Sequence, residues 1–244
     1  MSFKIIGHRG AISLAPENTL SSLFILKNSD INYIEIDTIL SMDNIPIIFH
    51  DKELDRVSNL KGEVIKYNFD DLKKADIGNM FSDKFKNERI PSLIEFISIS
   101  NKLSINIFLE LKSYYNDIND LQLVKEVVNR LNNINFEISI ILCSYSRNII
   151  KYLKKYGNKF KRSLIVDEIP DDYLEFLLEN DCFSININYK PSNDINKIKN
   201  IINTLPNSFY IYCHVINEKK DLDELRNIGI NGIITDIPIE ILKY

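Results

Sequence analysis

Three carboxylates in this sequence stand where they could hold one metal ion. Glu35 and Asp37 lie two residues apart in an apolar run, so in a β-strand both side chains point to the same face. Glu110 ends a later apolar run. Carboxylates at such positions are costly unless they are paired or bind a cation, and oxygen ligands without a thiolate suit a hard divalent ion. The sequence therefore predicts a Mg²⁺ or Ca²⁺ site formed by these three residues.

Two histidines could supply the acid and the base of a reaction at this site. His8 follows the first apolar run, and His50 follows the run at 45–49. An unperturbed imidazole has a pKa of about 6.5 and exchanges protons near neutral pH. A single histidine at a strand end is more often a capping or core residue, but two of them favour a catalytic pair. Each such group typically contributes on the order of 10²–10⁴ in rate.

Two basic residues adjoin these groups and set the charge of the predicted pocket. Arg9 follows His8 directly, and Lys112 lies two residues beyond Glu110. A divalent cation among three carboxylates leaves about one negative charge, so the two basic side chains would make the pocket net positive. Such a pocket suits a phosphodiester, whose oxygens arginine can bind with two hydrogen bonds. The alternative is a structural salt-bridge cluster without a metal.

Apolar runs rich in Ile, Leu, Val and Phe alternate with segments of helical spacing. Such runs are typical of parallel strands covered on both faces. The expected strands are Lys4–Gly7, Tyr33–Asp37, Ile105–Leu111, Ile138–Cys143, Phe160–Val166, Cys182–Ile187, Phe209–Cys213 and Gly232–Thr235. The expected helices are Thr19–Lys27, Leu93–Ser100, Leu121–Leu131, Arg147–Tyr156, Asp171–Glu179, Ile195–Ile202 and Leu222–Asn227.

This alternation within 244 residues indicates an α/β fold, the (β/α)₈ or TIM barrel. In such a barrel catalytic side chains lie at the carboxyl ends of strands, so the residues above could meet there. An open doubly wound sheet with a purely structural acidic cluster is the alternative. We expect one domain over residues 1–244. Its polar, turn-rich segment 51–89 would form an insertion or lid over the active site, with at most one short helix near Asp70–Ala75.

Composition argues against several other classes of protein. The net charge is −4 and basic residues are interspersed with acidic ones, so no nucleic-acid partner is expected. Three well-separated cysteines predict buried thiols in a reducing compartment. The sequence begins directly with a strand-like run and lacks an apolar run of the roughly 20 residues that span a bilayer. We therefore expect no signal peptide, no transmembrane segment and a cytoplasmic monomer or homodimer.

Short motifs along almost the whole chain resemble those of the glycerophosphodiester phosphodiesterase family. Each motif is weak alone, but together they occur in the family's order and at suitable spacing. The matching segments are His8-Arg9-Gly10, Ala15-Pro16-Glu17-Asn18-Thr19, Glu35-Ile36-Asp37, His50-Asp51 with Leu54-Asp55-Arg56, Ile90-Pro91-Ser92-Leu93, Glu110-Leu111-Lys112 and Asp236-Ile237-Pro238.

The resemblance implies a (β/α)₈ barrel with an insertion after the second strand. It also implies metal-dependent hydrolysis of a small glycerophosphodiester to an alcohol and sn-glycerol 3-phosphate. The implied metal ligands are Glu35, Asp37 and Glu110, the acid–base pair is His8 and His50, and the phosphate contacts are Arg9 and Lys112.

The chain departs from the family pattern near the end of the seventh strand. The family often has Trp there, but this sequence contains no Trp, and His214 takes the aromatic place. We expect His214 to line the mouth of the pocket. Asp51 is either a partner that orients His50 or a turn residue, whereas Pro16 and Glu17 are attributed to the start of a helix.

Alternative functions remain open at this point. One is a related barrel phospholipase, similar to the phosphatidylinositol-specific phospholipases C or to a lysophospholipase D. Another is a catalytically inactive barrel that binds phosphorylated ligands. Within the favoured function, the alcohol, the choice between Mg²⁺ and Ca²⁺, the assignment of acid and base, and a cyclic phosphate intermediate are undecided.

Overall fold

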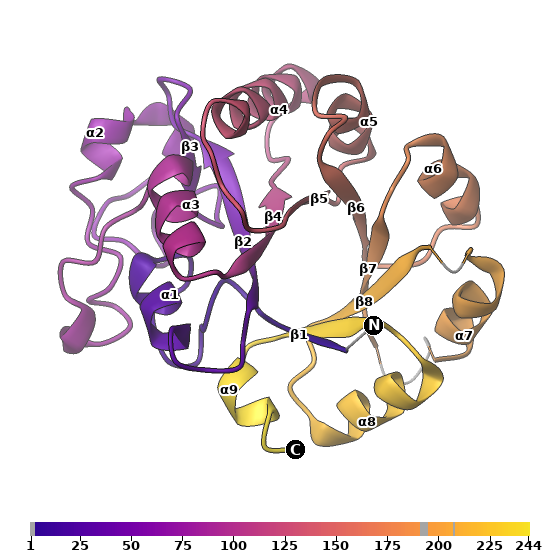
Figure 1. Cartoon of the computed structure of the whole chain (residues 1–244). Coiled ribbons are helices and arrows are strands. Elements are labelled where there is room, and N and C mark those ends of the chain that lie inside the picture. Colours follow the sequence, from indigo (N-terminus) through magenta and orange to yellow (C-terminus); the bar gives the residue numbers. More distant parts are fainter. Residues whose placement is uncertain (1–2, 191–194, 207) are drawn as a thin grey trace.

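A closed barrel of eight parallel strands, surrounded by helices, forms the centre of the computed structural model (Figure 1). The structure describes residues 3–190, 195–206 and 208–244. The first strand pairs with both the second and the last, which closes the ring. The predicted (β/α)₈ barrel is therefore confirmed, and the open doubly wound sheet is excluded.

The strands and helices alternate along the chain. The strands are β1 (Lys4–Gly7), β2 (Tyr33–Leu40), β3 (Pro46–Ile48), β4 (Asn106–Leu111), β5 (Ile140–Ser144), β6 (Lys161–Val166), β7 (Ser184–Asn188), β8 (Tyr210–His214) and β9 (Gly232–Thr235). The α-helices are α1 (Leu20–Leu26), α2 (Phe69–Leu72), α3 (Leu93–Lys102), α4 (Asp117–Asn132), α5 (Arg147–Tyr156), α6 (Tyr173–Glu179), α7 (Ile195–Thr204), α8 (Lys219–Ile228) and α9 (Pro238–Ile241).

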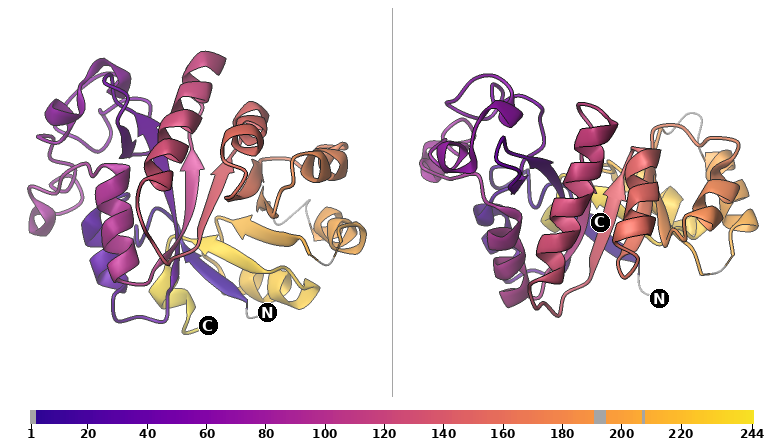
Figure 2. Two further views of the ribbon diagram at one scale, coloured as in Figure 1. Left: turned by 45° about the horizontal axis from the view of Figure 1, so that its top comes forward. Right: turned by 90° about the horizontal axis from the view of Figure 1, so that it is seen from above.

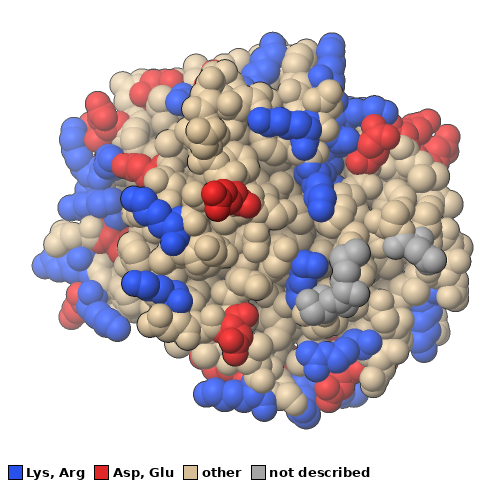
Figure 3. Space-filling model, in the orientation of Figure 1, with Lys and Arg blue, Asp and Glu red and all other residues tan. Residues whose placement is uncertain are grey.

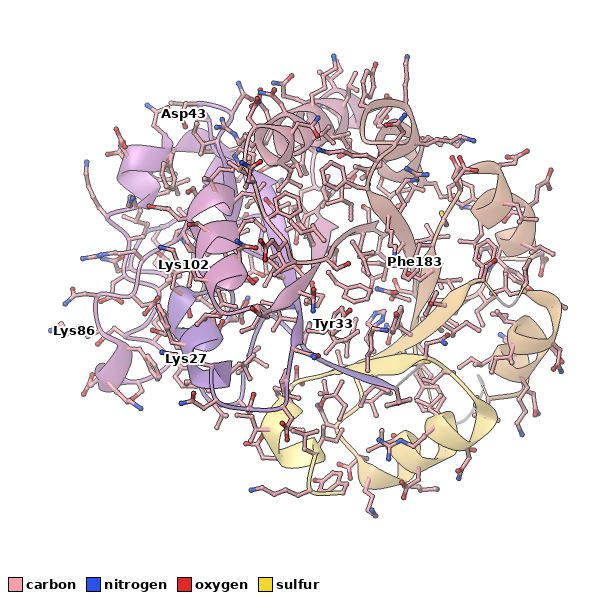
Figure 4. The ribbon with its side chains drawn as sticks, viewed as in Figure 1. Lys27, Tyr33, Asp43, Lys86, Lys102 and Phe183 are labelled. Carbon is pink, nitrogen blue, oxygen red and sulfur yellow. The ribbon has the colours of Figure 1, made fainter. Side chains whose placement is uncertain are left out.

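Alternation along each barrel strand separates two apolar layers. In β4, Ile107 and Leu109 join the large core between strands and helices, whereas Phe108 packs with Tyr212 in the smaller cluster. This smaller cluster fills the interior of the barrel, as alternate side chains of a closed sheet must. Figure 4 shows the labelled Tyr33 and Phe183, which pack against that cluster, near the centre of the ring. The labelled Lys27 and Lys86 lie at its periphery.

The neighbouring strands β2 and β4 set the register of the predicted acidic residues. Asp37 is the direct partner of Glu110 across these two parallel strands. Glu35 lies one inward position before Asp37 on the same strand. The sheet therefore places the three carboxylates on one inner wall near the carboxyl ends of the strands.

His50 does not follow one of the eight strands of the barrel. The preceding strand β3 is an added segment that pairs antiparallel with β2. It lies next to β2 at the end of the strand order and is not one of the parallel strands of the ring. The backbone N–H of Phe49 donates to the carbonyl of Asp37 at 3.1 Å. Because β3 folds back along β2, His50 arrives beside the end of β2 without belonging to the barrel.

The segment between β3 and α3 carries a small apolar cluster of its own. Leu54, Val64, Leu72 and Ile77 pack there with Ile47 of β3. The segment contains the short helix α2, as expected, and two 3₁₀ turns at Val64–Lys66 and Asp83–Phe85. Figure 2 shows it, in purple and magenta, beside the barrel near α1 and α3.

The two glycines that end helices differ in conformation, and the start of α1 corrects a sequence interpretation. Gly229 ends α8 with a φ of 94°, which is a left-handed cap. Gly157 ends α5 with a φ of −124° and forms no such cap; an added Cβ there would lie 2.9 Å from Val128. Thr19 caps α1, so Pro16 and Glu17 precede the helix and do not form its first turn.

The surface and the thiols agree with the composition. On the face shown in Figure 3, basic and acidic side chains are interspersed. Cys143, Cys182 and Cys213 are buried, and no disulfide joins them. Among the described residues, no helix combines the length and the apolar character needed to cross a membrane. Met1 and Ser2, the start of the N-terminal run discussed above, lie outside the described residues.

Replacing Leu54 by alanine tests whether the small cluster holds the 51–89 segment in place. Leu54 is 0% exposed within that cluster. We expect L54A to lower the free energy of unfolding by about 2–5 kcal/mol, the cost of truncating a buried leucine. Urea unfolding measures this free energy. The control is Leu178→Ala, at a leucine that is 49% exposed, and its free energy of unfolding should stay within about 0.5 kcal/mol of the wild-type value. An L54A value equal to that of the control would contradict the packing described.

Candidate active site

One cavity near the carboxyl ends of the barrel strands collects all eight residues predicted for the site. They come from β2, β4 and β8 and from the loops that follow β1, β3 and β4. The residues that line this cavity are His8, Arg9, Glu35, Asp37, His50, Glu110, Lys112, Tyr145, Ile165, Asn186, His214 and Ile234. The fold thus brings together groups that are spread over more than two hundred residues of sequence.

The three carboxylates form one buried cluster. Glu35, Asp37 and Glu110 each offer an oxygen, and these oxygens lie within 4.8 Å of one another. Their exposed fractions are 4%, 1% and 8%. Oε1 of Glu35 is buried and has no hydrogen-bond partner among the described residues. An unpartnered buried carboxylate oxygen beside two further carboxylates fits the oxygen coordination of a hard divalent cation.

The carboxyl groups differ in how readily they ionise. Burial, together with the charges of Asp37 and Glu110, raises the pKa of Glu35 well above its ordinary value. Burial and Asp37 raise the pKa of Glu110 to about 7. Burial also acts to raise the pKa of Asp37, but the charges of Lys112, His50 and Arg9 hold it below its ordinary value. Protons therefore compete with any cation for this cluster.

Lys112 and Arg9 lie directly against the carboxylates. Nζ of Lys112 is 2.7 Å from Oε1 of Glu110 and 3.5 Å from Oδ1 of Asp37. Nε of Arg9 is 3.6 Å from Oδ2 of Asp37, and the backbone N–H of Arg9 donates to Glu35 at 3.1 Å. Burial acts to lower the pKa of Lys112, but Asp37 and Glu110 raise it above its ordinary value. Both cations are therefore charged at neutral pH.

His8 is oriented by a carboxylate from the other end of the chain. Its Nδ1 lies 2.6 Å from Oδ1 of Asp236, whose other oxygen accepts from Nδ2 of Asn217 at 2.8 Å. These hydrogen bonds keep the pKa of Asp236 below its ordinary value, although burial acts to raise it. The hydrogen bond with His8 has the largest effect. An ionised carboxylate only accepts, so Nδ1 of His8 carries the proton and Nε2, 4.0 Å from Glu35, faces the cavity.

His50 has a matching arrangement with a different outer partner. Its Nδ1 lies 2.6 Å from Oδ1 of Asp51, and Nε of Arg56 donates to Oδ2 of Asp51 at 2.6 Å. Burial, with the charges of Lys112 and Arg9, lowers the pKa of His50, although Asp37 opposes them. Of the two roles considered for Asp51, the structure supports orientation of His50.

Glu17 joins the two arginines around the site. Its Oε1 accepts from Nη1 of Arg9 at 2.8 Å and from Nη2 of Arg56 at 2.7 Å, while its Oε2 accepts from Nη1 of Arg56 at 2.8 Å. Through Arg56 and Asp51, this network reaches His50. The earlier attribution of Glu17 to a helix start was therefore wrong, because the residue binds side chains from two loops.

Sequence reasoning missed several other contacts. Nδ2 of Asn18 donates to Asp37 at 2.9 Å, and its Oδ1 accepts from the backbone N–H of Asp37 at 3.1 Å. Asn18 and Asp236 both belong to the family-like motifs, so their recurrence there was the available signal. Asn186 gave no signal, because it lies inside an ordinary strand pattern.

His214 lines the cavity, as expected. Its Nε2 lies 2.9 Å from the hydroxyl of Tyr145, and its Nδ1 is buried without a partner among the described residues. Burial, and to a lesser extent the charge of His8, lowers the pKa of His214 to about 4. The imidazole is therefore uncharged at neutral pH.

Comparison with known proteins identifies the family. The sequence model of the glycerophosphoryl diester phosphodiesterase family matches residues 8–240. The chain belongs to this family. It is thus a glycerophosphodiester phosphodiesterase by descent, and the match covers every residue of the candidate site.

Relatives and solved structures agree with the assignment to the glycerophosphodiester phosphodiesterases. The glycerophosphodiester phosphodiesterase of Caldanaerobacter subterraneus subsp. tengcongensis is 26% identical over 98% of this chain and 96% of that protein. That of Bacillus altitudinis is 26% identical over 98% and 97%. An Oleispira antarctica phosphodiesterase, solved with the product sn-glycerol-3-phosphate, superposes with a TM-score of 0.91 at 27% identity, over 98% of this chain and 95% of that one.

The raised pKa values of Glu35 and Glu110 predict how stability and cation binding depend on pH. Between the ordinary pKa of 4.5 and about 7, the folded cation-free protein holds a proton on Glu110 that the unfolded chain has lost. The stability of the cation-free protein should therefore fall as pH rises through this window. A cation needs the ionised form, so Mg²⁺ or Ca²⁺ should raise the melting temperature more at pH 8 than at pH 5.5.

Thermal melting with cation or chelator measures this difference. At a cation concentration one hundred times Kd the gain is about 2.7 kcal/mol. Glu110→Gln should abolish it, whereas Glu126→Gln on helix α4, outside the cavity, should retain it. An equal gain at both pH values, or a gain that persists in E110Q, would contradict a cation site at these carboxylates.

Proposed function

We propose that this protein hydrolyses small glycerophosphodiesters to an alcohol and sn-glycerol 3-phosphate, with a divalent cation and a pair of histidines. The observation that carries the proposal is the convergence of three buried carboxylates with two imidazoles in one cavity. Membership in the glycerophosphoryl diester phosphodiesterase family supports the reaction. So does the Oleispira antarctica neighbour, which was solved with this product.

The cation would be held by Glu35, Asp37 and Glu110. When bound, it supplies Lewis-acid polarisation of a phosphate oxygen and partial neutralisation of the buried carboxylates. The oxygen-only ligand set suits Mg²⁺ or Ca²⁺. A cation would also complete the coordination of Oε1 of Glu35, which lacks a partner among the described residues.

His8 and His50 act as the acid–base pair in this proposal. Each imidazole has its Nδ1 fixed by an aspartate, so its Nε2 is left for substrate. One histidine removes a proton from the attacking hydroxyl or water, and the other protonates the departing alkoxide. The fixed tautomer matters because a reversed ring would present a nitrogen with the wrong protonation state.

Arg9 and Lys112 bind the phosphate, and Glu17 positions Arg9. Lys112 is 11% exposed and Arg9 16% exposed at their side chains, so both act in a weakly solvated cavity where their charges are strong. Glu17 holds the outer side of Arg9, whose Nε lies 3.6 Å from Oδ2 of Asp37 and makes no hydrogen bond among the described residues. In this proposal that N–H donates to an anionic oxygen of the phosphate.

We infer that residues 51–89 form one side of the active site within a single domain of 244 residues. Arg56 of this segment connects Asp51 to Glu17 of the loop after β1. The segment thus fixes His50 while bordering the entrance. The buried cysteines agree with work in the cytoplasm, as a monomer or homodimer.

The cluster of three carboxylates favours glycerophosphodiester hydrolysis over the two alternative functions. A phospholipase of the phosphatidylinositol-specific type does not need three converging carboxylates, and here they converge. An inactive barrel would be expected to have lost a histidine or a carboxylate, and all five are in place.

Removing either imidazole should stop turnover without removing the cation site. We expect His8→Ala and His50→Ala to lower kcat by on the order of 10²–10⁴, the usual contribution of a general acid or base. Release of sn-glycerol 3-phosphate from sn-glycero-3-phosphocholine, sn-glycero-3-phosphoethanolamine and glycerophosphoglycerol measures this. The cation-dependent gain in melting temperature should persist in both variants.

Chelation provides the matched test of the cation. Excess chelator should abolish turnover by the wild-type protein, and added Mg²⁺ or Ca²⁺ should restore it. Glu126→Gln serves as the carboxylate control with unchanged rates. Full activity in chelator, or near-wild-type rates in either alanine variant, would refute the proposal.

A further inference from the structure

The wall of the cavity opposite the carboxylates has a different character. The ring order of the strands places β7 four positions from β2 in either direction, and β8 four positions from β4. Asn186 of β7 therefore lies across the barrel from Glu35 and Asp37, and His214 of β8 lies across from Glu110. The first wall carries charged groups, whereas the second carries an amide, an imidazole, the Tyr145 hydroxyl and aliphatic side chains.

Asn186 is held rigidly by two serines beneath it. Its Oδ1 accepts from Oγ of Ser163 at 2.8 Å. Oγ of Ser163 in turn accepts from Oγ of Ser184 at 2.7 Å. Both serines are 0% exposed and Asn186 is 1% exposed. In this arrangement the amide oxygen faces the two hydroxyls, so the NH₂ end faces away from them.

The Nδ2 group of Asn186 has no hydrogen-bond partner among the described residues although it is buried. Buried amide groups are nearly always satisfied, because an unsatisfied one loses its hydration without compensation. Asn186 lines the cavity, in register with Ile165 on one side and Tyr212 on the other. A fixed donor that faces a cavity is arranged for an acceptor on a ligand.

Nδ1 of His214, which makes no hydrogen bond within the described part of the chain, belongs to the same wall. The low pKa of His214, about 4, leaves this ring uncharged, and Asn186 carries no charge at any pH. The phosphate of a diester is drawn to the wall with Arg9 and Lys112, and an ester arm that enters the cavity from there meets the uncharged wall. An arm with hydroxyl groups satisfies the donor there, whereas a hydrocarbon arm leaves it unsatisfied.

We infer that Asn186, fixed by Ser163 and Ser184, is a specificity-determining residue that donates a hydrogen bond to a free hydroxyl group of the glycerol arm. The inference rests on the proposed function for the identity of the phosphate wall. By this inference, Asn186 selects diesters whose arm carries a free hydroxyl group over diesters whose arms carry none.

The test compares two diester substrates, and then two phosphate monoester ligands, in variants of one strand. Asn186→Leu removes the donor at nearly constant volume. Asn188→Leu is the control, because Asn188 lies on the same strand but binds Asp167 and does not line the cavity. Rates are measured with sn-glycero-3-phosphocholine and with bis(4-nitrophenyl) phosphate, which has no hydroxyl group.

We expect N186L to lower kcat/KM about tenfold for the glycerol diester, the loss expected for one neutral hydrogen bond, and less than twofold for the nitrophenyl diester. N188L should leave both rates unchanged. Equal losses on both substrates, or no loss on either, would overturn the inference.

A binding measurement separates this inference from the reaction itself. By calorimetry, N186L should bind sn-glycerol 3-phosphate about tenfold more weakly than the wild-type protein does, and its affinity for ethyl phosphate should be unchanged. Should the wild-type protein hydrolyse neither diester, the proposed function fails, and this comparison still decides the role of Asn186. Should N186L not fold, as judged by circular dichroism, Ser163→Ala releases the amide and should weaken the same ligand several-fold. Equal weakening of both ligands would count against a contact with hydroxyl groups.

Discussion

The repulsion among three buried carboxylates is the constraint on which the rest of the site depends. Their oxygens lie within 4.8 Å of one another in the barrel wall. Two unit charges 4 Å apart interact by about 4 kcal/mol at an effective dielectric constant of 20, so such a cluster cannot stand ionised alone. Lys112, Arg9 and a proton on the carboxylates, among which Glu35 and Glu110 have raised pKa values, balance it in the protein without cation. The same balance makes the cluster ready to exchange that proton for a metal ion.

Closure of the barrel determines the catalytic geometry. His8 follows the first strand and Asp236 follows the last, 228 residues away, yet they lie 2.6 Å apart. Their contact exists only because β1 pairs with β9. His50 depends on a second link, in which Arg56 connects the inserted segment to Glu17. The two imidazoles are therefore fixed by different parts of the fold, one by the barrel and one by the insertion.

The two walls of the cavity differ in charge, and we assign them different parts of the substrate. The wall formed by β1, β2 and β4 carries the charges that a phosphate and a cation need. The wall formed by β6, β7 and β8 is uncharged but holds polar groups with donors or acceptors that make no hydrogen bond to the described residues, most clearly Asn186. Charge on one side fixes the reacting centre, and neutral hydrogen-bonding groups on the other can distinguish one ester arm from another. Substrate choice can then change on the second wall without disturbing the first.

Local patterns in the amino-acid sequence predicted the barrel and most of the charged wall. Period-two spacing placed Glu35 and Asp37 on one face, and apolar runs located the parallel strands, because both follow from local strand geometry. The folded arrangement was needed to show that β3 lies outside the barrel, that Glu17 joins two arginines, and that Asp236 orients His8. It was also needed to show that Asn186 lines the cavity with a donor that makes no hydrogen bond among the described residues. These features depend on contacts between distant segments and on which side-chain atoms are left without partners, and no local pattern in the chain encodes either.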